Sequence, residues 1–418
     1  MVDLLQSLDS PQQVAMTAQR LRERALGLET TPAQVIDALA RWGESLVGPA
    51  FDAIPGSPFL KLWLRRGTLE PIVARELGPN ALNGMWHDER AARIRTFPVG
   101  LVGHWPAGNI EIQPLLSMSC ALLGGNACLV RVPSGLVAQT RTLIERLSET
   151  DSARLLAERI ALVAFDHDRM DLQRAMASAV DGAMIWGGDE AVTQIRALPF
   201  PHWARVAVFG PRLSVAAMDG QSWSGGPDRE TWCLRIARDV WQFDQQACSS
   251  PQVLFLERHP AGDVGEFAAM LAAAFREENR LHPRRDIHPA LVSAICLSRA
   301  SWLLNDGGHR AIFPQAPDWT ILVGEGAAIP APTQGRTLSV LLVDSLFDPI
   351  AKFDGTVQTL GLAVRDGTKE AQLAHAAGRN GVDRIVKLGR MHTFGSPWDG
   401  MDLIRPMVRL VRHVPSGE

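Results

Sequence analysis

Tyrosine is missing from this chain, and cysteine is sparse and scattered. Without tyrosine there is no Tyr-x-x-x-Lys acid and base pair, which one large class of nicotinamide-dependent reductases requires, so hydride chemistry would need another design. The five cysteines form no C-x-x-C pair, which argues against a disulfide framework and against a structural zinc site. Thiol chemistry in a reducing compartment is left open. These cysteines are Cys120, Cys128, Cys233, Cys248 and Cys296.

Several sequence motifs are also absent. There is no G-x-G-x-x-G, no P-loop and no G-x-S-x-G elbow, so a usual Rossmann fingerprint cannot be claimed and a serine hydrolase is disfavoured. No apolar run is long enough for a membrane span, and the acidic N-terminus is not a signal peptide, so we expect a cytoplasmic protein. A net charge of −3 predicts no general binding of nucleic acid. Residues 282–288 hold two histidines, but Pro and Arg dominate this segment and no ligand set is complete, so we predict no metal.

The remaining pattern alternates strands with helices, which predicts an α/β fold built on doubly wound parallel sheets. At 418 residues the chain suits two or three domains. Ser10-Pro11 and Thr31-Pro32 are helix-start signals, so the N-terminal region is predicted to be helical. The predicted strands are residues 99–103, 127–132, 160–165, 182–186 and 205–209, then 253–256, 319–323, 338–343, 360–364 and 384–388. The predicted helices among them are residues 115–123, 136–147, 170–179, 236–243 and 265–277.

Cys248 is the most informative single residue. It follows an apolar, aromatic helical segment and directly precedes the predicted strand 253–256, so it lies in a tight connection where a thiolate could meet a bound acyl group. A thiol attacks only as the thiolate, which requires surroundings that lower its pKa. The alternative is that Cys248 is simply a small buried hydrophobic residue, as free cysteines commonly are.

Other candidates follow the predicted strands of the first α/β block. Asn109 comes after the first strand and is either an oxyanion donor or an ordinary turn residue. Gly187 and Gly188 begin a strand-to-helix turn that either admits phosphates or is only tight. Arg131, before Pro133-Ser134, either reaches a ribose or an adenosine phosphate or is a solvated cation.

Four segments occur in order along the chain: Gly103 to Asn109, Gly125 to Arg131, Trp186-Gly187-Gly188-Asp189-Glu190, and Gln246-Ala247-Cys248. In order and approximate spacing they resemble the aldehyde dehydrogenase superfamily. The Trp186 to Glu190 segment and Ser396-Pro397-Trp398-Asp399-Gly400 resemble one branch of it, the acyl-CoA reductases of the LuxC type, and the resemblance covers about residues 95 to 415. The segments Phe209 to Ser214 and Gln358-Thr359 add to the LuxC-type likeness.

The resemblance implies roles by position. Cys248 matches the nucleophile, and Asn109 matches the oxyanion-hole asparagine, with the backbone N–H of Cys248 as the second donor. Arg131 falls where a lysine usually lies near the adenosine ribose, and Gly187 and Gly188 fall at the turn facing the cofactor pyrophosphate. The implied cofactor site comprises Arg131, Pro133, Ser134, Trp186, Gly187 and Gly188.

Two positions depart from the superfamily pattern. Val208 replaces the glutamate that activates water in ordinary aldehyde dehydrogenases, which predicts that the acyl-enzyme resists hydrolysis. Gln245 stands where glycine usually precedes the glutamine, which leaves the geometry of the local loop in question.

The implied domains are an N-terminal helical region packing on the cofactor lobe (1–95), a dinucleotide-binding lobe (96–228), a catalytic lobe (229–392) and a C-terminal segment (393–418). The implied activity is reduction of an acyl-CoA or acyl carrier protein thioester to an aldehyde, with NADPH expected and NADH possible. The resemblance also suggests an acyl-activating partner protein, and a homo-oligomer is possible. A thiol acyltransferase or carrier without redox chemistry, a non-acylating aldehyde dehydrogenase and a degenerate scaffold are the alternatives.

Overall fold

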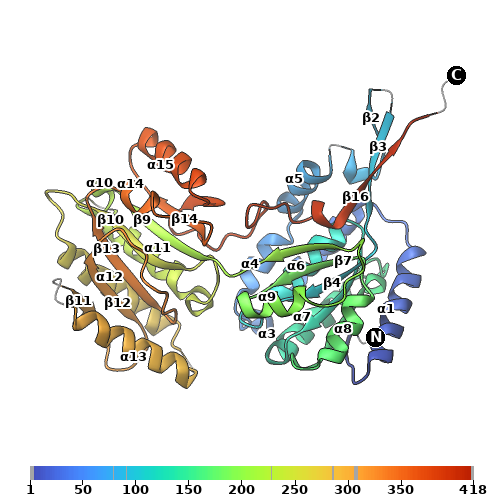
Figure 1. Ribbon diagram of the computed structural model, residues 1–418, viewed down its shortest axis with the longest axis horizontal. Helices are drawn as coiled ribbons and strands as arrows, with labels where there is room; N and C mark the ends of the chain where they lie inside the picture. The colour runs from blue at the N-terminus through green and yellow to red at the C-terminus, as the bar shows by residue number, and fades with distance from the viewer. Residues whose placement is uncertain are drawn as a thin grey trace. The chain divides into compact units, whose positions relative to one another are not determined.

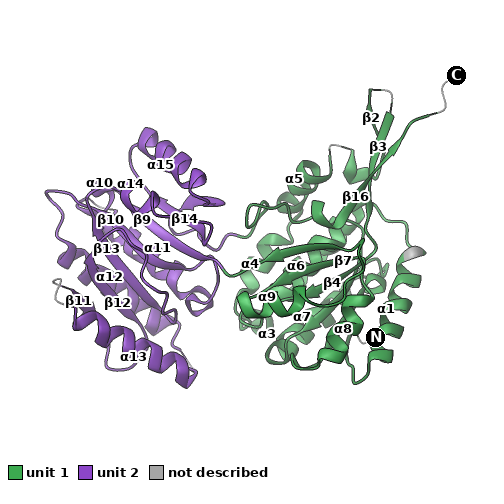
Figure 2. Cartoon of the chain, viewed as in Figure 1, with its two compact units in different colours: residues 1–211, 394–418 green, residues 212–393 purple. Residues whose placement is uncertain are grey.

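The computed structural model describes residues 4–78, 80–90, 92–226, 228–284, 287–305 and 309–415. The chain forms two compact units, which Figure 2 colours separately. Unit 1 comprises residues 1–211 and 394–418, and unit 2 comprises residues 212–393. The expected boundary at 228/229 therefore lies at 211/212 instead, because strand β9 (Leu213–Met218) pairs with two strands of the second sheet. The expected separate C-terminal segment returns to unit 1.

Unit 1 is built on a six-stranded sheet in the order β1-β6-β5-β4-β7-β8, in which every strand pair is parallel. Strands predicted at 127–132, 182–186 and 205–209 form with those bounds, and the strand predicted at 99–103 begins two residues later. The edge strand β1 was not predicted. The strands are β1 (Leu5–Ser7), β4 (Leu101–Trp105), β5 (Ala127–Val132), β6 (Ile160–Ala164), β7 (Gly182–Trp186) and β8 (Arg205–Phe209).

The first two helices of unit 1 begin where the sequence signals them. Ser10 and Thr31 each accept a hydrogen bond from a backbone N–H of the first helical turn, and the glutamine three residues later completes a capping box. Proline occupies the first turn of both helices, where no N–H partner is needed. The helices are α1 (Pro11–Leu26), α2 (Pro32–Ser45), α3 (Pro49–Asp52), α4 (Ser57–Trp63), α5 (Arg66–Leu77), α6 (Gln113–Leu123), α7 (Val137–Thr150), α8 (Met170–Ser178) and α9 (Asp189–Arg196).

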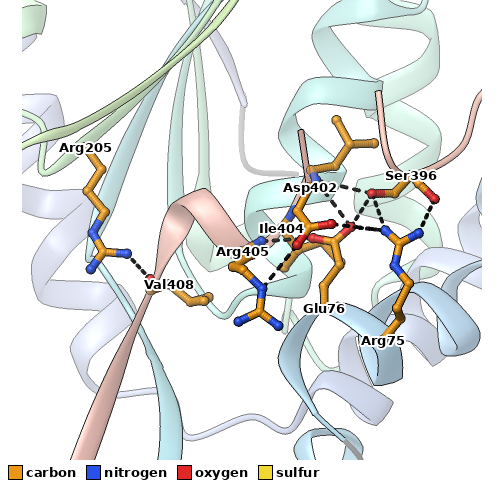
Figure 3. A network of polar contacts seen from close by, with 9 residues as sticks. Arg75, Glu76, Arg205, Ser396, Asp402, Ile404, Arg405 and Val408 are labelled. Carbon is orange, nitrogen blue, oxygen red and sulfur yellow. Dashed lines mark hydrogen bonds and ion pairs between the residues drawn. The ribbon is translucent and has the colours of Figure 1, made fainter. Parts of the chain in front are cut away.

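The returning C-terminal segment is tied to unit 1 in two ways. Its strand β16 (Val408–His413) pairs antiparallel with β3 (Ala92–Pro98), which also pairs with β2 (His87–Glu89). The fully buried carboxylate of Glu76, at the end of α5, accepts hydrogen bonds from the backbone N–H groups of Leu403, Ile404 and Arg405 and from the Ser396 hydroxyl (Figure 3). The neighbouring Arg75 donates to the carbonyl and the hydroxyl of Ser396, so a buried acid and an adjacent arginine hold this segment against α5.

Unit 2 holds a seven-stranded sheet in the order β11-β12-β13-β10-β9-β14-β15, parallel except for β11 (Figure 1). Alternate residues of β10 face opposite sides: Val253 and Phe255 join one hydrophobic core, and Leu254 and Leu256 join the other. Both faces are therefore covered, as parallel sheets require. The strands after β9 are β10 (Pro251–Glu257), β11 (Arg310–Ile312), β12 (Thr320–Glu325), β13 (Thr337–Val343), β14 (Val357–Ala363) and β15 (Arg384–Lys387).

The helices of unit 2 are α10 (Gly220–Trp223), α11 (Arg229–Trp241), α12 (Val264–Leu281), α13 (Pro289–Leu303), α14 (Phe347–Ile350) and α15 (Gly367–Arg379). The helices predicted at 236–243 and 265–277 overlap α11 and α12, and helices α10, α13, α14 and α15 were not predicted. Among the described residues, none of the helices is both long enough and apolar enough to cross a bilayer.

Candidate active site

The candidate residues of unit 1 meet at one edge of its sheet. Strands β5, β4 and β7 are parallel neighbours, so the loops that follow them lie side by side at their carboxyl ends. These loops carry Asn109, Pro133-Ser134 and Gly187-Gly188. The loops after β4 and β5 are in contact range, because a Cβ on Gly108 would lie 3.5 Å from the Cβ of Pro133.

The order of these strands makes that edge a natural ligand site. From β4 the chain steps outward to β5 and β6, then returns to β7 on the other side of β4. Ligands of doubly wound sheets bind outside the carboxyl ends at such a reversal. The loops after β4 and β7, which hold Asn109 and Gly188, flank this reversal.

Arg131, near the end of β5, is buried, with 9% of its surface exposed, so it is not a solvated strand-end cation. Its guanidinium lies 5.7 Å from the ring centroid of Phe165, and its buried Nε has no hydrogen-bond partner among the described residues. Burial lowers the pKa of Arg131, and the negative charge of Asp166 opposes that shift. The Ser134 hydroxyl donates to Asp166 Oδ1 at 2.7 Å. A cation, a hydroxyl and a carboxylate thus gather beside the switch point, a donor and acceptor set that fits a nucleotide's ribose and phosphate.

The Trp186-Gly187-Gly188 turn is held by contacts of the Trp186 side chain. The Trp186 indole donates to Ser117 Oγ at 2.9 Å and stacks on Phe209, with centroids 3.8 Å apart. A Cβ built on Gly188 would meet no described atom within 4 Å, so a ligand has room to approach this backbone. However, α9 begins with two carboxylates, Asp189 and Glu190, which disfavour a second negative charge at that helix end.

Cys248 lies in unit 2, half-buried, in the short loop between the 3-10 helix η4 (Gln242–Gln245) and β10. The loop precedes β10, and β10 runs parallel to its neighbours β9 and β13, so the loop lies at the edge of the sheet where these strands begin, its amino edge. Its backbone is anchored there: the Ser214 hydroxyl, at the start of β9, donates to the Cys248 carbonyl at 2.6 Å. Asn109 belongs to unit 1 and Cys248 to unit 2.

The turn before Cys248 has a rare backbone conformation. Phe243, Asp244 and Gln245 have φ of 54°, 52° and 61°, the left-handed region that non-glycine residues seldom adopt. This geometry explains why glycine would suit position 245.

The side chain of Gln245 compensates for the strain at its position. It is fully buried, donates at 2.8 Å to the carbonyls of Pro251 and Thr337, and accepts from the Thr337 N–H at 2.7 Å. It therefore ties the loop to the first residues of β10 and β13.

An ion pair supports the same turn. Arg336, just before β13, donates from Nε to Asp244 Oδ1 at 2.6 Å, and its guanidinium lies 4.4 Å from the centroid of Trp241. Arg284 lies 3.4 Å from the other carboxylate oxygen of Asp244. Two guanidinium groups thus face one carboxylate. The strained turn is held by these two arginines as well as by its own Gln245 side chain.

Sequence reasoning missed the buried polar residues around Cys248. Ser214 ends the Phe209 to Ser214 motif, so that motif contained the only available signal. The pair Ser249 and His392, 2.9 Å apart in the structure, carried no sequence signal, because 143 residues separate them. No group of three His, Cys, Asp or Glu side chains that could hold a metal occurs in the described ranges. The segment 282–288, for which we predicted no metal, lies partly outside those ranges, at Arg285 and Asp286.

Comparison with known proteins agrees with this architecture. The family model for acyl-CoA reductase (LuxC) matches residues 49–412. Long-chain acyl-protein thioester reductase 2 of Photobacterium leiognathi is 21% identical over 84% of this chain and 70% of its own length. The corresponding reductase of Vibrio harveyi is 24% identical over 84% and 71%.

Solved structures share the fold at low identity. An NADP-dependent enzyme of E. coli superposes with a TM-score of 0.74 at 13% identity, covering 96% of this chain and 90% of that one. An aldehyde dehydrogenase of Brucella melitensis gives 0.73 at 12% identity, covering 98% and 90%. The fold is thus that of the aldehyde dehydrogenases, and because the family model spans most of the residues, the chain belongs to the LuxC family of acyl-CoA reductases.

Proposed function

We propose that this enzyme reduces a long-chain acyl thioester to the aldehyde through a covalent thioester on Cys248, with NADPH as the reductant. The observation that carries the proposal is the placement of Cys248, half-buried in a braced loop directly before a central strand. The other cysteines are less suitable. Burial raises the pKa of Cys120, Cys128 and Cys233, and Cys296 is exposed on α13.

In the first stage, the Cys248 thiolate attacks the carbonyl carbon of the substrate thioester. A bond forms between Sγ and the acyl carbon, the bond to the substrate's sulfur breaks, and the leaving thiolate takes up a proton. During the attack the carbonyl oxygen gains negative charge, which the Asn109 side-chain N–H and the Cys248 backbone N–H would stabilise.

In the second stage, a bound nicotinamide would supply a hydride to the acyl carbon, after which the bond between that carbon and Cys248 Sγ would break, releasing the aldehyde and restoring the thiolate. The residues at the carboxyl edge of the unit 1 sheet would hold this cofactor. Arg131, buried and with an unpaired Nε, would meet the ribose or its 2′-phosphate. The Ser134 hydroxyl, which donates to Asp166, would accept a hydrogen bond from a ribose hydroxyl. The open backbone at Gly188 would admit an uncharged part of the cofactor, since Asp189 and Glu190 repel phosphate there.

The absence of a base at position 208 fits a reductase. Val208 lies on β8 and can neither accept a proton nor orient water. An acyl-enzyme in such a site should survive until reduction rather than be lost to hydrolysis.

The relatives' names indicate a substrate carried on a protein, and the family name indicates coenzyme A. Both substrates present the same thioester to Cys248, so the proposal covers either carrier. A complex with an acyl-activating protein would supply the acyl group directly.

Mass spectrometry of the intact protein and of its proteolytic peptides tests the covalent step. We expect tetradecanoyl-CoA without cofactor to add one acyl mass to the Cys248 peptide, and NADPH to remove it with release of aldehyde. The Cys248→Ser variant should show no adduct and at least about a 10³-fold loss of turnover, whereas Cys296→Ser should behave as wild type. An adduct that NADPH leaves in place would indicate an acyltransferase, and no adduct on Cys248 would exclude the covalent route.

A further inference from the structure

The peptide group between Cys248 and Ser249 is held on both sides by buried side chains of unit 2. On one side the Ser214 hydroxyl donates to the Cys248 carbonyl at 2.6 Å. On the other, Ser249 Oγ lies 2.9 Å from Nδ1 of His392. Ser214, Ser249 and His392 are 0%, 4% and 5% exposed, so water does not compete for these bonds.

The hydrogen bonds of His392 determine which group donates to which. Its Nε2 lies 2.7 Å from the backbone carbonyl of Asp239, and a carbonyl oxygen only accepts, so Nε2 carries the hydrogen. In the neutral ring Nδ1 is then an acceptor, and Ser249 must donate its hydroxyl proton to it. The orientation of the Ser249 hydroxyl is therefore set by Asp239 through the imidazole.

The segment that carries His392 is itself fixed. Arg384, at the amino end of β15, donates at 2.9 Å to the carbonyls of both Met391 and Thr393, the residues on either side of His392. The carboxylate of Asp239 accepts from the Gly389 and Met391 N–H groups.

The ring is also kept neutral. Burial lowers the pKa of His392 to about 4, a net shift to which the positive charge of Arg384 contributes and which the hydrogen bond to the Asp239 carbonyl opposes. The imidazole is thus an acceptor at neutral pH, as the geometry requires.

From this geometry we infer that His392, acting through Ser249, and Ser214 are positioning residues that together orient the Cys248 backbone and so direct its thiol for acylation. This role rests on the proposed function of Cys248. Neither residue needs to touch the substrate. If the hydrogen bond from Ser214 or the one between Ser249 and His392 is removed, the peptide group can rotate. A displacement of about 1 Å at a nucleophile costs about 10²-fold in rate.

The acylation rate measured by rapid quench and mass spectrometry, with tetradecanoyl-CoA and no cofactor, tests the inference. We expect Ser214→Ala and Ser249→Ala to acylate about 10- to 100-fold more slowly, with the dissociation constant of the acyl-CoA unchanged. Ser222→Ala is the matched control, since Ser222 is equally buried in unit 2 but lies on α10.

Two substitutions of His392 separate hydrogen bonding from packing. The oxygen of His392→Asn can accept from Ser249 near the former Nδ1 position, whereas His392→Leu fills the space without an acceptor. We expect Asn to retain more of the acylation rate than Leu, and packing alone predicts the reverse. The double variant Ser249→Ala/His392→Leu should be no slower than the slower single variant, because both remove the same bond.

The outcomes separate this inference from the proposed function. If wild-type protein forms no acyl adduct on Cys248, the proposed function fails. If it does, and the alanine variants acylate at the wild-type rate or Leu matches Asn at position 392, the positioning role alone is wrong.

Discussion

The two units use opposite edges of similar parallel sheets. In unit 1 the candidate residues follow β4, β5 and β7 at the carboxyl edge, where the strand order reverses. In unit 2 Cys248 precedes β10 at the amino edge. The difference shows that a doubly wound sheet offers a ligand site at one edge by topology alone, whereas a site at the other edge has to be assembled from side chains.

The means of support differ accordingly. The loops of unit 1 are short and rich in glycine and proline, and their position follows from the strands. The turn before the Cys248 loop is strained, and buried polar side chains hold the turn and the loop: Gln245, Ser214 and His392 by hydrogen bonds. We therefore expect substitutions in unit 1 to affect cofactor binding, and substitutions in unit 2 to affect the acylation rate or the stability.

Asn109 offers the strongest way to break this division, because it lies in unit 1 but is assigned to the chemistry. Loss of one oxyanion donor costs about 10²–10³ in rate, so Asn109→Ala should lower turnover by that factor with cofactor affinity retained. Steady-state kinetics together with a cofactor titration measure both, and Asn305→Ala, an exposed residue after α13, is the control. Undiminished turnover would remove Asn109 from the mechanism.

Gln245 tests whether strain and bracing offset each other in unit 2. Gln245→Ala removes three buried hydrogen bonds and should lower the free energy of unfolding by about 2–4 kcal/mol. Gln245→Gly loses the same bonds but relieves the backbone at φ of 61°, so it should be more stable than the alanine variant by about 0.5–1 kcal/mol. Urea denaturation measures the difference, with exposed Gln194→Ala as control. An alanine variant more stable than the glycine variant would argue against stored strain.

Two buried titratable groups, His104 in unit 1 and Asp239 in unit 2, should make the stability depend on pH in opposite directions. Burial lowers the pKa of His104 in unit 1 to about 3, so between pH 6.5 and 3 the unfolded chain holds the extra proton and stability falls as the pH falls. Burial raises the pKa of Asp239 in unit 2 to about 7, so between pH 4 and 7 the folded chain holds the extra proton and stability falls as the pH rises.

Urea denaturation from pH 4.5 to 6.5 should therefore change in opposite directions in two variants. His104→Asn should make the slope of unfolding free energy against pH more negative, and Asp239→Asn should make it more positive, each by up to about 1.4 kcal/mol per pH unit. Slopes equal to that of wild type would show that these groups titrate normally.

Arg131 gives the smallest expected effect and sharpens the assignment of unit 1. Arg131→Leu should weaken NADPH binding about tenfold and NADH binding less, because a guanidinium bonds a 2′-phosphate more strongly than a hydroxyl. Fluorescence titration measures both dissociation constants, and Arg174→Leu, an exposed residue on α8, is the control. Equal losses for both cofactors would place Arg131 away from the 2′-phosphate.

The fold was largely predictable because its elements carry local signals. Strands 127–132, 182–186 and 205–209 are short apolar runs between turn residues, and they form with those bounds. The helices at Pro11 and Pro32 begin at their capping residues. Strands β2, β3 and β16 were missed because charged residues interrupt all three, and only their pairing with one another defines them.

The sequence by itself determined the alternation of strands and helices, the helix starts and the candidacy of Cys248, since periodicity, capping and chain order act over a few residues. Tertiary structure alone decided that β9 belongs to the second sheet and that His392 reaches Ser249. It also decided that Arg131 is buried and that Gln245 adopts a left-handed backbone. Each of these depends on contacts between residues far apart in the chain, which no local pattern encodes.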